Sequence, residues 1–215
     1  MLKADLHIHT VYSMDCALSL ETIISRCLKI GINCVAVSDH GTIAGALKLK
    51  GDAPFPVIVA EEIVTPYGEI MGLFLTNEIR SPLPAEEAIA QIKAQDGLVC
   101  IPHPFDQARL SAFGHEALES LIPKVDIIEV FNARSLFHGS SARAWQLAHK
   151  HGLPVSAGSD AHTASEIGNA YVEMPEFIGK DDFIESLKQG RIFGHKSSPL
   201  VHVASTWSRF KKHYL

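Results

Sequence analysis

The segment Gly158-Ser-Asp-Ala-His162, which follows the apolar run Leu153-Pro-Val-Ser-Ala157, decides how the rest of the chain is interpreted. It is typical of a buried strand that stops on two metal-binding side chains, Asp160 and His162. Their spacing allows both side chains to point the same way. We therefore expect this end of a strand to form part of a metal site.

The beginning of the chain has the same character. Asp5, His7 and His9 occupy every second position, so an extended strand would present them on one face and Leu6 and Ile8 on the other. Two strands from opposite ends of the chain therefore predict one shared metal site.

Composition limits the class of protein. With 215 residues, 47% hydrophobic and 20% charged, the chain is long enough for one domain with a substantial core, and we expect a single domain over 1–215 with a tail, 191–215, packed on it. A net charge of −5 without a basic run argues against strong nucleic-acid binding. With no apolar run of about 18 residues and no room for a leader before the first strand, we expect a cytoplasmic protein without membrane contact.

Apolar runs that read as strands alternate with segments of helical periodicity. The expected strands are 3–9, 34–38, 57–64, 69–75, 98–101, 127–131 and 154–157, and the expected helices are 18–29, 85–94, 116–121, 140–149 and 181–188. This alternation favours a mainly parallel sheet with crossover helices. The connection between Val64 and Glu69 is too short for a helix, so the strand from Glu69 should run antiparallel to its predecessor.

Polar residues at the strand ends distinguish a barrel from an open sheet. Nearly every expected strand ends on a histidine, a carboxylate or an asparagine: His7 and His9, Asp39 and His40, Glu61 and Glu62, His103, Asn132, Asp160 and His162. A β/α barrel gathers such ends at one mouth, whereas an open sheet spreads them apart. We therefore predict an α/β fold, a distorted seven-stranded (β/α)7 barrel with a metal site at the C-terminal mouth of its strands.

Five of these segments, in this order, resemble the motifs of the PHP family, named for polymerase and histidinol phosphatase. They are Asp5-Leu-His-Ile-His-Thr10, Ser38-Asp-His40, Ala60-Glu-Glu-Ile63, Ile101-Pro-His-Pro104 and Gly158-Ser-Asp-Ala-His162, within a resemblance that covers about residues 3 to 200. The resemblance implies a distorted seven-stranded barrel that holds three divalent metals. Stand-alone members of the family include metal-dependent phosphoesterases.

The resemblance also implies which residues bind metal. It assigns His7, His9 and Asp160 to one metal, Glu62 as a bridge to a second metal that His103 also binds, and Asp15, His40 and His162 to the third. The remaining position of the family pattern, a histidine before Leu-Gly, is Glu69 in this chain. A carboxylate there would favour harder ions such as Mn²⁺.

The chemistry of these residues points the same way without the resemblance. Imidazoles and carboxylates together suit Mn, Fe or Zn, so we expect two or three such divalent ions as cofactors. The positive charge of the ions would exceed the negative charge of the carboxylates, and the surplus would attract a phosphate group. Metal ions can acidify a shared water and stabilise the attacking and leaving oxygens of a displacement at phosphorus.

Other residues are candidates for supporting roles. Asn132 and Arg134 follow a strand and could contact a substrate phosphate, for which Arg is a natural bidentate partner. Arg109 and His195 are further phosphate candidates, and Asp5 and Asp39 could orient ligand histidines.

The sequence therefore predicts a metal-dependent hydrolase that acts on phosphoric ester bonds, with a hydroxide bridging the metals as nucleophile. The substrate would be a phosphomonoester or phosphodiester of a small molecule or a nucleotide. Two alternatives stay open: an exonuclease that trims oligonucleotides, and a non-catalytic, metal-holding regulatory module. The phosphate ester, the native metal, the general acid and the oligomeric state do not follow from the sequence.

Overall fold

The structure, a computed structural model, describes residues 1–106, 115–136, 138–198 and 201. Its strands are β1 (Leu2–Ile8), β2 (Cys34–Val37), β3 (Val57–Thr65), β4 (Gly68–Leu73), β5 (Leu98–Ile101), β6 (Ile127–Asn132), β7 (Val155–Gly158), β8 (Ala170–Met174) and β9 (Arg191–Gly194). Its helices are α1 (Leu20–Ile30), α2 (Ala44–Asp52), α3 (Ala85–Ala94), α4 (His115–Leu121), the 3₁₀ turn η1 (Ile122–Lys124), α5 (His138–His151) and α6 (Lys180–Lys188).

The strands form one nine-stranded sheet in the order β7-β6-β5-β4-β3-β2-β1-β8-β9. β1, β2 and β3 are parallel, as are β5, β6 and β7, whereas β4 runs antiparallel to both of its neighbours. The short β3–β4 turn forces this reversal, and the predicted antiparallel strand is confirmed. The parallel ends therefore face one side of the molecule.

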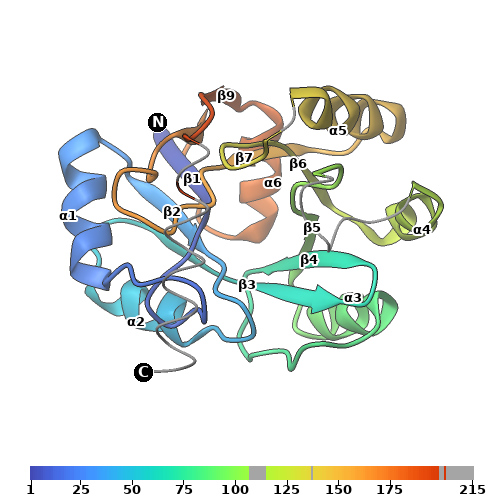
Figure 1. The fold of residues 1–215 in the computed structure, drawn as a ribbon, viewed down its shortest axis with the longest axis horizontal. Helices are drawn as coiled ribbons and strands as arrows, with labels where there is room; N and C mark the ends of the chain where they lie inside the picture. The colour runs from blue at the N-terminus through green and yellow to red at the C-terminus, as the bar shows by residue number, and fades with distance from the viewer. Residues whose placement is uncertain (107–114, 137, 199–200, 202–215) are drawn as a thin grey trace.

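β7, at one edge of the sheet, meets β1 and nearly closes a barrel (Figure 1). Just past β7, the Asp160 amide donates to the His7 carbonyl at 2.7 Å, and the His9 amide donates to the Ala161 carbonyl at 3.0 Å. Gly158 makes this approach possible, because a Cβ at this position would lie 2.2 Å from the Cβ of His7. The predicted distorted barrel is confirmed.

Two hydrophobic clusters line the inner and outer faces of the sheet. Alternate strand residues such as Ala4, Ala36 and Met71 pack together with Phe183 and Leu187 of α6, which fills one end of the interior. The other strand residues pack against the surrounding helices, which lie around the strands in Figure 1. Apolar side chains thus fill the barrel interior near α6. Polar side chains occupy the other end of the barrel, where the parallel strands terminate.

All of the predicted elements are present, and no boundary is shifted by more than two residues. α1 begins two residues later than expected, after Ser19, whose side chain accepts from the Thr22 amide, and is capped at its end by Gly31 with a φ of 78°. Besides the 3₁₀ turn η1, three elements were missed: α2, which connects the parallel strands β2 and β3, and the antiparallel strands β8 and β9, which extend the sheet beyond β1. β9 lies within the segment that we expected to be a tail.

No helix within the described ranges combines the length and hydrophobicity that crossing a membrane requires.

Candidate metal centre

The eight predicted ligands converge at the end of the barrel where the parallel strands terminate. His7 and Glu62 lie on β1 and β3; His9, His40, His103, Asp160 and His162 follow the ends of β1, β2, β5 and β7; and Asp15 comes from the loop between β1 and α1. His40 continues β2 far enough to form an isolated bridge with Glu62. Chain segments from residue 7 to residue 162 therefore share one polar centre.

Ligand atoms of these residues form three groups in which all atoms lie within 4.8 Å of one another. The groups are His7, His9 and Asp160; His7, Glu62 and His103; and His9, Asp15, His40 and His162. His7 and His9 each belong to two groups. Adjacent groups that share ligands are the arrangement expected of a site for more than one metal ion.

In the first two groups, electron-pair donors face one another at short distance, and a cation bound between them would make these contacts favourable. The Nδ1 atom of His7 lies 3.0 Å from Glu129 Oε1, so in the neutral ring Nδ1 carries the proton and Nε2 presents its lone pair. That lone pair faces His9 Nε2 at 3.2 Å and Glu62 Oε2 at 3.3 Å, which are also electron-pair donors. Ligands bound at about 2.0–2.2 Å to a common ion lie roughly 3–3.5 Å apart, so the residues fit a divalent metal.

Glu62 lies at the centre of the cluster and is fully buried. Its Oε1 is 2.9 Å from His103 Nε2, and its Oε2 is 3.4 Å from His9 Nε2 and 3.7 Å from His40 Nε2. With His7 on the same oxygen, one carboxylate thus connects histidines of all three groups. The bridging role of Glu62 stays a prediction, whereas Glu61 points elsewhere and accepts the Ile79 amide at 2.9 Å.

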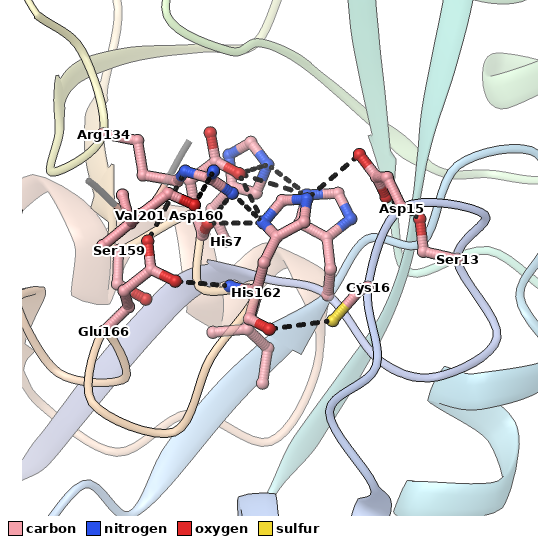
Figure 2. A network of polar contacts seen from close by, with 12 residues as sticks. His7, Ser13, Asp15, Cys16, Arg134, Ser159, Asp160, His162, Glu166 and Val201 are labelled. Atoms are coloured by element: carbon pink, nitrogen blue, oxygen red, sulfur yellow. Dashed lines mark hydrogen bonds and ion pairs between the residues drawn. The ribbon is translucent and has the colours of Figure 1, made fainter. Parts of the chain in front are cut away.

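The third group is built around Asp15. Its Oδ2 lies 3.1 Å from His162 Nε2 and 3.6 Å from His40 Nε2, and the Ser13 hydroxyl donates to its Oδ1 at 2.8 Å. Figure 2 shows Asp15 approaching His162 from one side, with Arg134 and Glu166 on the other. A loop residue thus completes a ligand set that the strand ends begin.

Glu69 is placed near the cluster but outside the three groups. Its Oε2 lies 3.7 Å from His103 Nε2, and it is buried at the start of β4 opposite Val64. Its role as a ligand of the second metal stays a prediction.

Glu129 is a site residue that the sequence analysis missed. Besides contacting His7, it accepts the His103 amide at 2.8 Å and the Asn132 side-chain amide at 3.1 Å. This buried carboxylate thus fixes the orientation of two predicted ligands from different strands. A lone acid inside the apolar run Ile127-Ile-Glu-Val-Phe131 was the available signal.

Arg134 and Glu166 hold the turn that carries Asp160 and His162. Glu166, also missed, accepts the His162 and Thr163 amides at 3.1 and 2.9 Å, and its other oxygen lies 3.5 Å from Arg134 Nε. Arg134 donates to the Asp160 carbonyl at 3.4 Å and contacts His162 Nδ1. The Arg134–Glu166 ion pair is buried and supports this turn on the side of His162 away from Asp15 (Figure 2).

Asp5 lies apart from the cluster, contrary to the expectation that it shares a face with His7 and His9. A register shift between Asp5 and Ile8 turns it away, and it accepts the Ser159 amide at 2.8 Å and the Gly168 amide at 2.9 Å. Burial raises its pKa to about 6, against the effect of these bonds. Asp5 therefore secures the chain after β7 rather than a ligand imidazole.

The other supporting candidates have mixed outcomes. The Asn132 amide lies 3.2 Å from Asp160 Oδ2, inside the cluster, whereas the His195 side chain is exposed. Asp39 accepts the amide and hydroxyl of Thr10, both at 2.6 Å, rather than contacting a histidine. Arg109 lies outside the described residues.

Opposite charges stabilise one another within the cluster. Burial lowers the pKa of His9, but hydrogen bonds and charges of Asp160 and Glu62 outweigh it and raise the pKa to about 10. Burial raises the pKa of Asp15, but His162, His40 and His9 outweigh it and hold the pKa well below the usual value. Burial, with the charge of His9, lowers the pKa of His162 to about 4. Without metal, the raised pKa values of His7 and His9 thus favour protons on these two rings, whereas the lowered pKa of His162 favours its neutral form.

Comparison with known proteins agrees with this geometry. The model of the PHP domain matches residues 5–70, and that of the PHP-associated region, PHP_C, matches residues 139–192. An uncharacterized protein from Methanocaldococcus jannaschii is 34% identical over 198 residues, covering 87% of this chain and 79% of its own.

This chain belongs to the PHP family.

Solved structures show the same fold for this PHP protein. A two-domain protein from Bacteroides vulgatus, described as containing a predicted PHP-like metal-dependent phosphoesterase, has a TM-score of 0.72 at 17% identity and covers 98% of this chain and 69% of its own. An amidohydrolase from Chromobacterium violaceum, with bound sulfate and no metal, has a TM-score of 0.63 at 17% identity and covers 77% of this chain and 89% of its own. At these identities the likeness concerns the fold.

Proposed function

We propose that this PHP protein is a metal-dependent phosphoesterase that hydrolyses phosphate esters of small molecules or nucleotides. The observation that carries the proposal is the set of three metal-ligand groups joined by His7, His9 and Glu62 at the open end of the barrel. When bound there, divalent ions would lower the pKa of a shared water and polarise phosphoryl oxygens. A cluster of this kind suits displacement at phosphorus without a protein nucleophile.

The residues of the chain would prepare the site for this reaction. Glu62 would hold its two oxygens toward different ions, and Glu129 would fix the tautomer of His7 so that Nε2 faces the cluster. The Arg134–Glu166 pair would keep His162 aimed toward Asp15. Such rigid support favours catalysis because ligand geometry need not reorganise during the reaction.

The names of the structural relatives support related but different chemistries. The Bacteroides protein is described as containing a predicted PHP-like metal-dependent phosphoesterase, and the Chromobacterium protein as an amidohydrolase with bound sulfate, a tetrahedral oxyanion like phosphate. We favour ester hydrolysis at phosphorus because the PHP-domain match covers the motifs of His7, His9, His40 and Glu62. Small substrates are favoured over long nucleic acids by the net charge of −5.

A substrate screen tests the proposal. Protein loaded in turn with Mn²⁺, Fe²⁺ and Zn²⁺ would be assayed against a nucleoside monophosphate, an aryl phosphodiester, a short oligonucleotide and an N-acyl amino acid, with His9→Ala and Asp160→Asn as controls. We expect hydrolysis of a small phosphate ester that both substitutions abolish.

Other results would identify the alternatives. Cleavage of the oligonucleotide alone would indicate a trimming exonuclease, and cleavage of the amide alone would indicate an amidohydrolase. Metal binding without turnover of any substrate would indicate a non-catalytic, metal-holding module and contradict the proposal.

A further inference from the structure

Arg134, predicted from sequence to contact substrate phosphate, is committed to the protein itself. Only 4% of its surface is exposed. Its Nη1 donates to the Asp160 carbonyl at 3.4 Å, its Nη2 donates to the Val201 carbonyl at 3.4 Å, and its Nε faces Glu166. A guanidinium held in this way supports the turn after β7 and leaves the contact with a phosphate to another cation.

Lys196 lies at the same end of the barrel, next to the end of β6. Its ammonium donates to the Asn132 carbonyl at 2.9 Å, and the next residue, Ser197, donates its amide to the Ala133 carbonyl at 2.8 Å. The side chain of Asn132 in turn reaches Asp160 Oδ2 at 3.2 Å. A single residue therefore separates the ammonium from a predicted metal ligand.

The position of the Lys196 side chain is fixed before any substrate binds. It is half-buried, and its Nζ lies 4.9 Å from the centre of the Phe131 ring. Desolvation lowers the pKa of the ammonium, and the charges of Asp106 and Glu129 oppose that effect. One of the three N–H groups of the Lys196 ammonium donates to the Asn132 carbonyl, and the ammonium has further N–H donors for an anion.

We propose that Lys196 binds the phosphoryl oxygens of the substrate that project beyond the metal cluster. The inference rests on the proposed function and assigns the substrate a phosphate that contacts both the metal centre and this ammonium. A partly desolvated, preoriented cation forms stronger charge-assisted hydrogen bonds than an exposed one. The exposed neighbour His195, predicted from sequence to contact phosphate, is replaced in this role by Lys196.

Binding of inorganic phosphate to the metal-loaded protein tests this inference. Lys196→Met keeps the approximate length and the apolar stem of the side chain but removes the charge, and Lys196→Arg keeps the charge. Lys188→Met, in an exposed ion pair with Glu185 on α6, is the matched control. Calorimetry would give the phosphate dissociation constant, with metal content and Tm measured alongside.

We expect Lys196→Met to weaken phosphate binding by about 10- to 100-fold and to raise KM more than it changes kcat. Metal content should stay constant, Lys196→Arg should recover part of the affinity, and Lys188→Met should match wild type. Unchanged phosphate affinity in Lys196→Met would overturn the inference, as would loss of metal or of folding in both Lys196 variants, which would indicate a packing role.

The wild-type protein separates this inference from the proposed function. Wild type that binds phosphate through Lys196 but hydrolyses no ester would overturn the proposed function and leave the anion site standing. Ester hydrolysis with a phosphate affinity that Lys196→Met does not alter would overturn the anion site alone. Wild type that neither binds phosphate nor hydrolyses an ester would overturn both.

Discussion

His7 illustrates how a single side chain depends on a partner distant in sequence. Its Nε2 faces the cluster, and its Nδ1 is bonded to Glu129, which is 122 residues away in the chain and also holds His103. Orienting carboxylates of this kind raise the basicity of a ligand imidazole and fix its tautomer. Glu129 should therefore matter for metal affinity although it need not bind metal.

Replacing Glu129 by glutamine tests that dependence. Glu129→Gln should weaken metal binding by about 10- to 100-fold because the charge that orients His7 is lost. Competition with a chromogenic chelator would measure the effect. Glu61→Gln is the matched control, since Glu61 is equally buried but bonds to Ile79, and it should bind metal as wild type does. Equal affinities for all three proteins would contradict the role assigned to Glu129.

Metal affinity should also rise with pH. In the metal-free protein the pKa of His9 is raised to about 10 and the pKa of His7 is raised well above its usual value, so both imidazoles are protonated at neutral pH. Metal must displace these protons, and higher pH reduces the competition until the pH passes about 10 for His9.

The expected gain is about tenfold in affinity per pH unit for each proton released. Calorimetry at pH 6.0, 6.8 and 7.5 in buffers of different ionisation enthalpy would count the protons. A pH-independent affinity with no proton release would show that the histidines are neutral before metal arrives.

A site residue could be predicted when the residues that define its role are close to it in the sequence, and not when they are distant. The spacing of His7 and His9, and of Asp160 and His162, is local, so pattern and resemblance were sufficient to select them as candidate ligands. Glu129 and Glu166 act through partners that only folding brings near. Arg134 was recognised as a polar residue at a strand end, but its partner Glu166 could not be inferred from spacing.

At the scale of elements, the junction between β1 and the segment after β7 positions ligands from both ends of the chain. The hydrogen bonds of His7 and His9 with Asp160 and Ala161 align the two segments. The junction requires that Gly158 have no side chain, since a Cβ there would also lie 2.7 Å from the His7 amide nitrogen. Packing at this one position therefore controls the separation of His7 and Asp160.

Gly158→Ala should destabilise the fold and disturb metal binding together. The added methyl must move backbone of β1, at a cost of about 1–3 kcal/mol, and the shift should lower metal affinity. Chemical denaturation and metal titration would measure both effects. Gly51→Ala in α2 meets no atom within 4 Å and should gain about 0.5–1 kcal/mol with metal affinity unchanged. A Gly158→Ala protein with wild-type stability and metal affinity would show that β1 and the segment after β7 can move apart without harm to the site.

Elements with a regular pattern were predictable, and those defined by their neighbours were not. α3 has the predicted bounds because its apolar residues repeat at helical spacing and Pro84 precedes it. α2 has glycines at positions 45 and 51 and no capping side chain, so its helical state depends on crossing between β2 and β3. β8 and β9 are recognisable as strands only once β1 offers an edge to pair with.

At the scale of the whole molecule, the sheet brings many like-charged groups into one buried centre. Glu62, Asp160 and Glu129 are buried together with histidines whose charge depends on protons or metal. The apolar clusters and α6 must therefore stabilise the fold against the cost of this centre when metal is absent. Metal should add stability in proportion to its affinity and concentration.

Removing metal should lower the melting temperature. At a free metal concentration 100 times the dissociation constant, each site adds about 2.7 kcal/mol, which corresponds to roughly 5–10 °C for a chain of this size. Differential scanning calorimetry with chelator and with added Mn²⁺ or Zn²⁺ would show the difference. Asp160→Asn should reduce the shift. The same melting temperature with and without metal would contradict a metal centre in the folded protein.

The junction of β1 with the turn after β7 also orders events during synthesis. His7 and His9 leave the ribosome before Asp160 and His162, which follow some 150 residues later. In the nascent protein, His7 and His9 therefore lack Asp160 and His162 until translation has passed His162. Complete metallation would therefore be a late step of biogenesis, and truncated translation products would lack part of the predicted metal site.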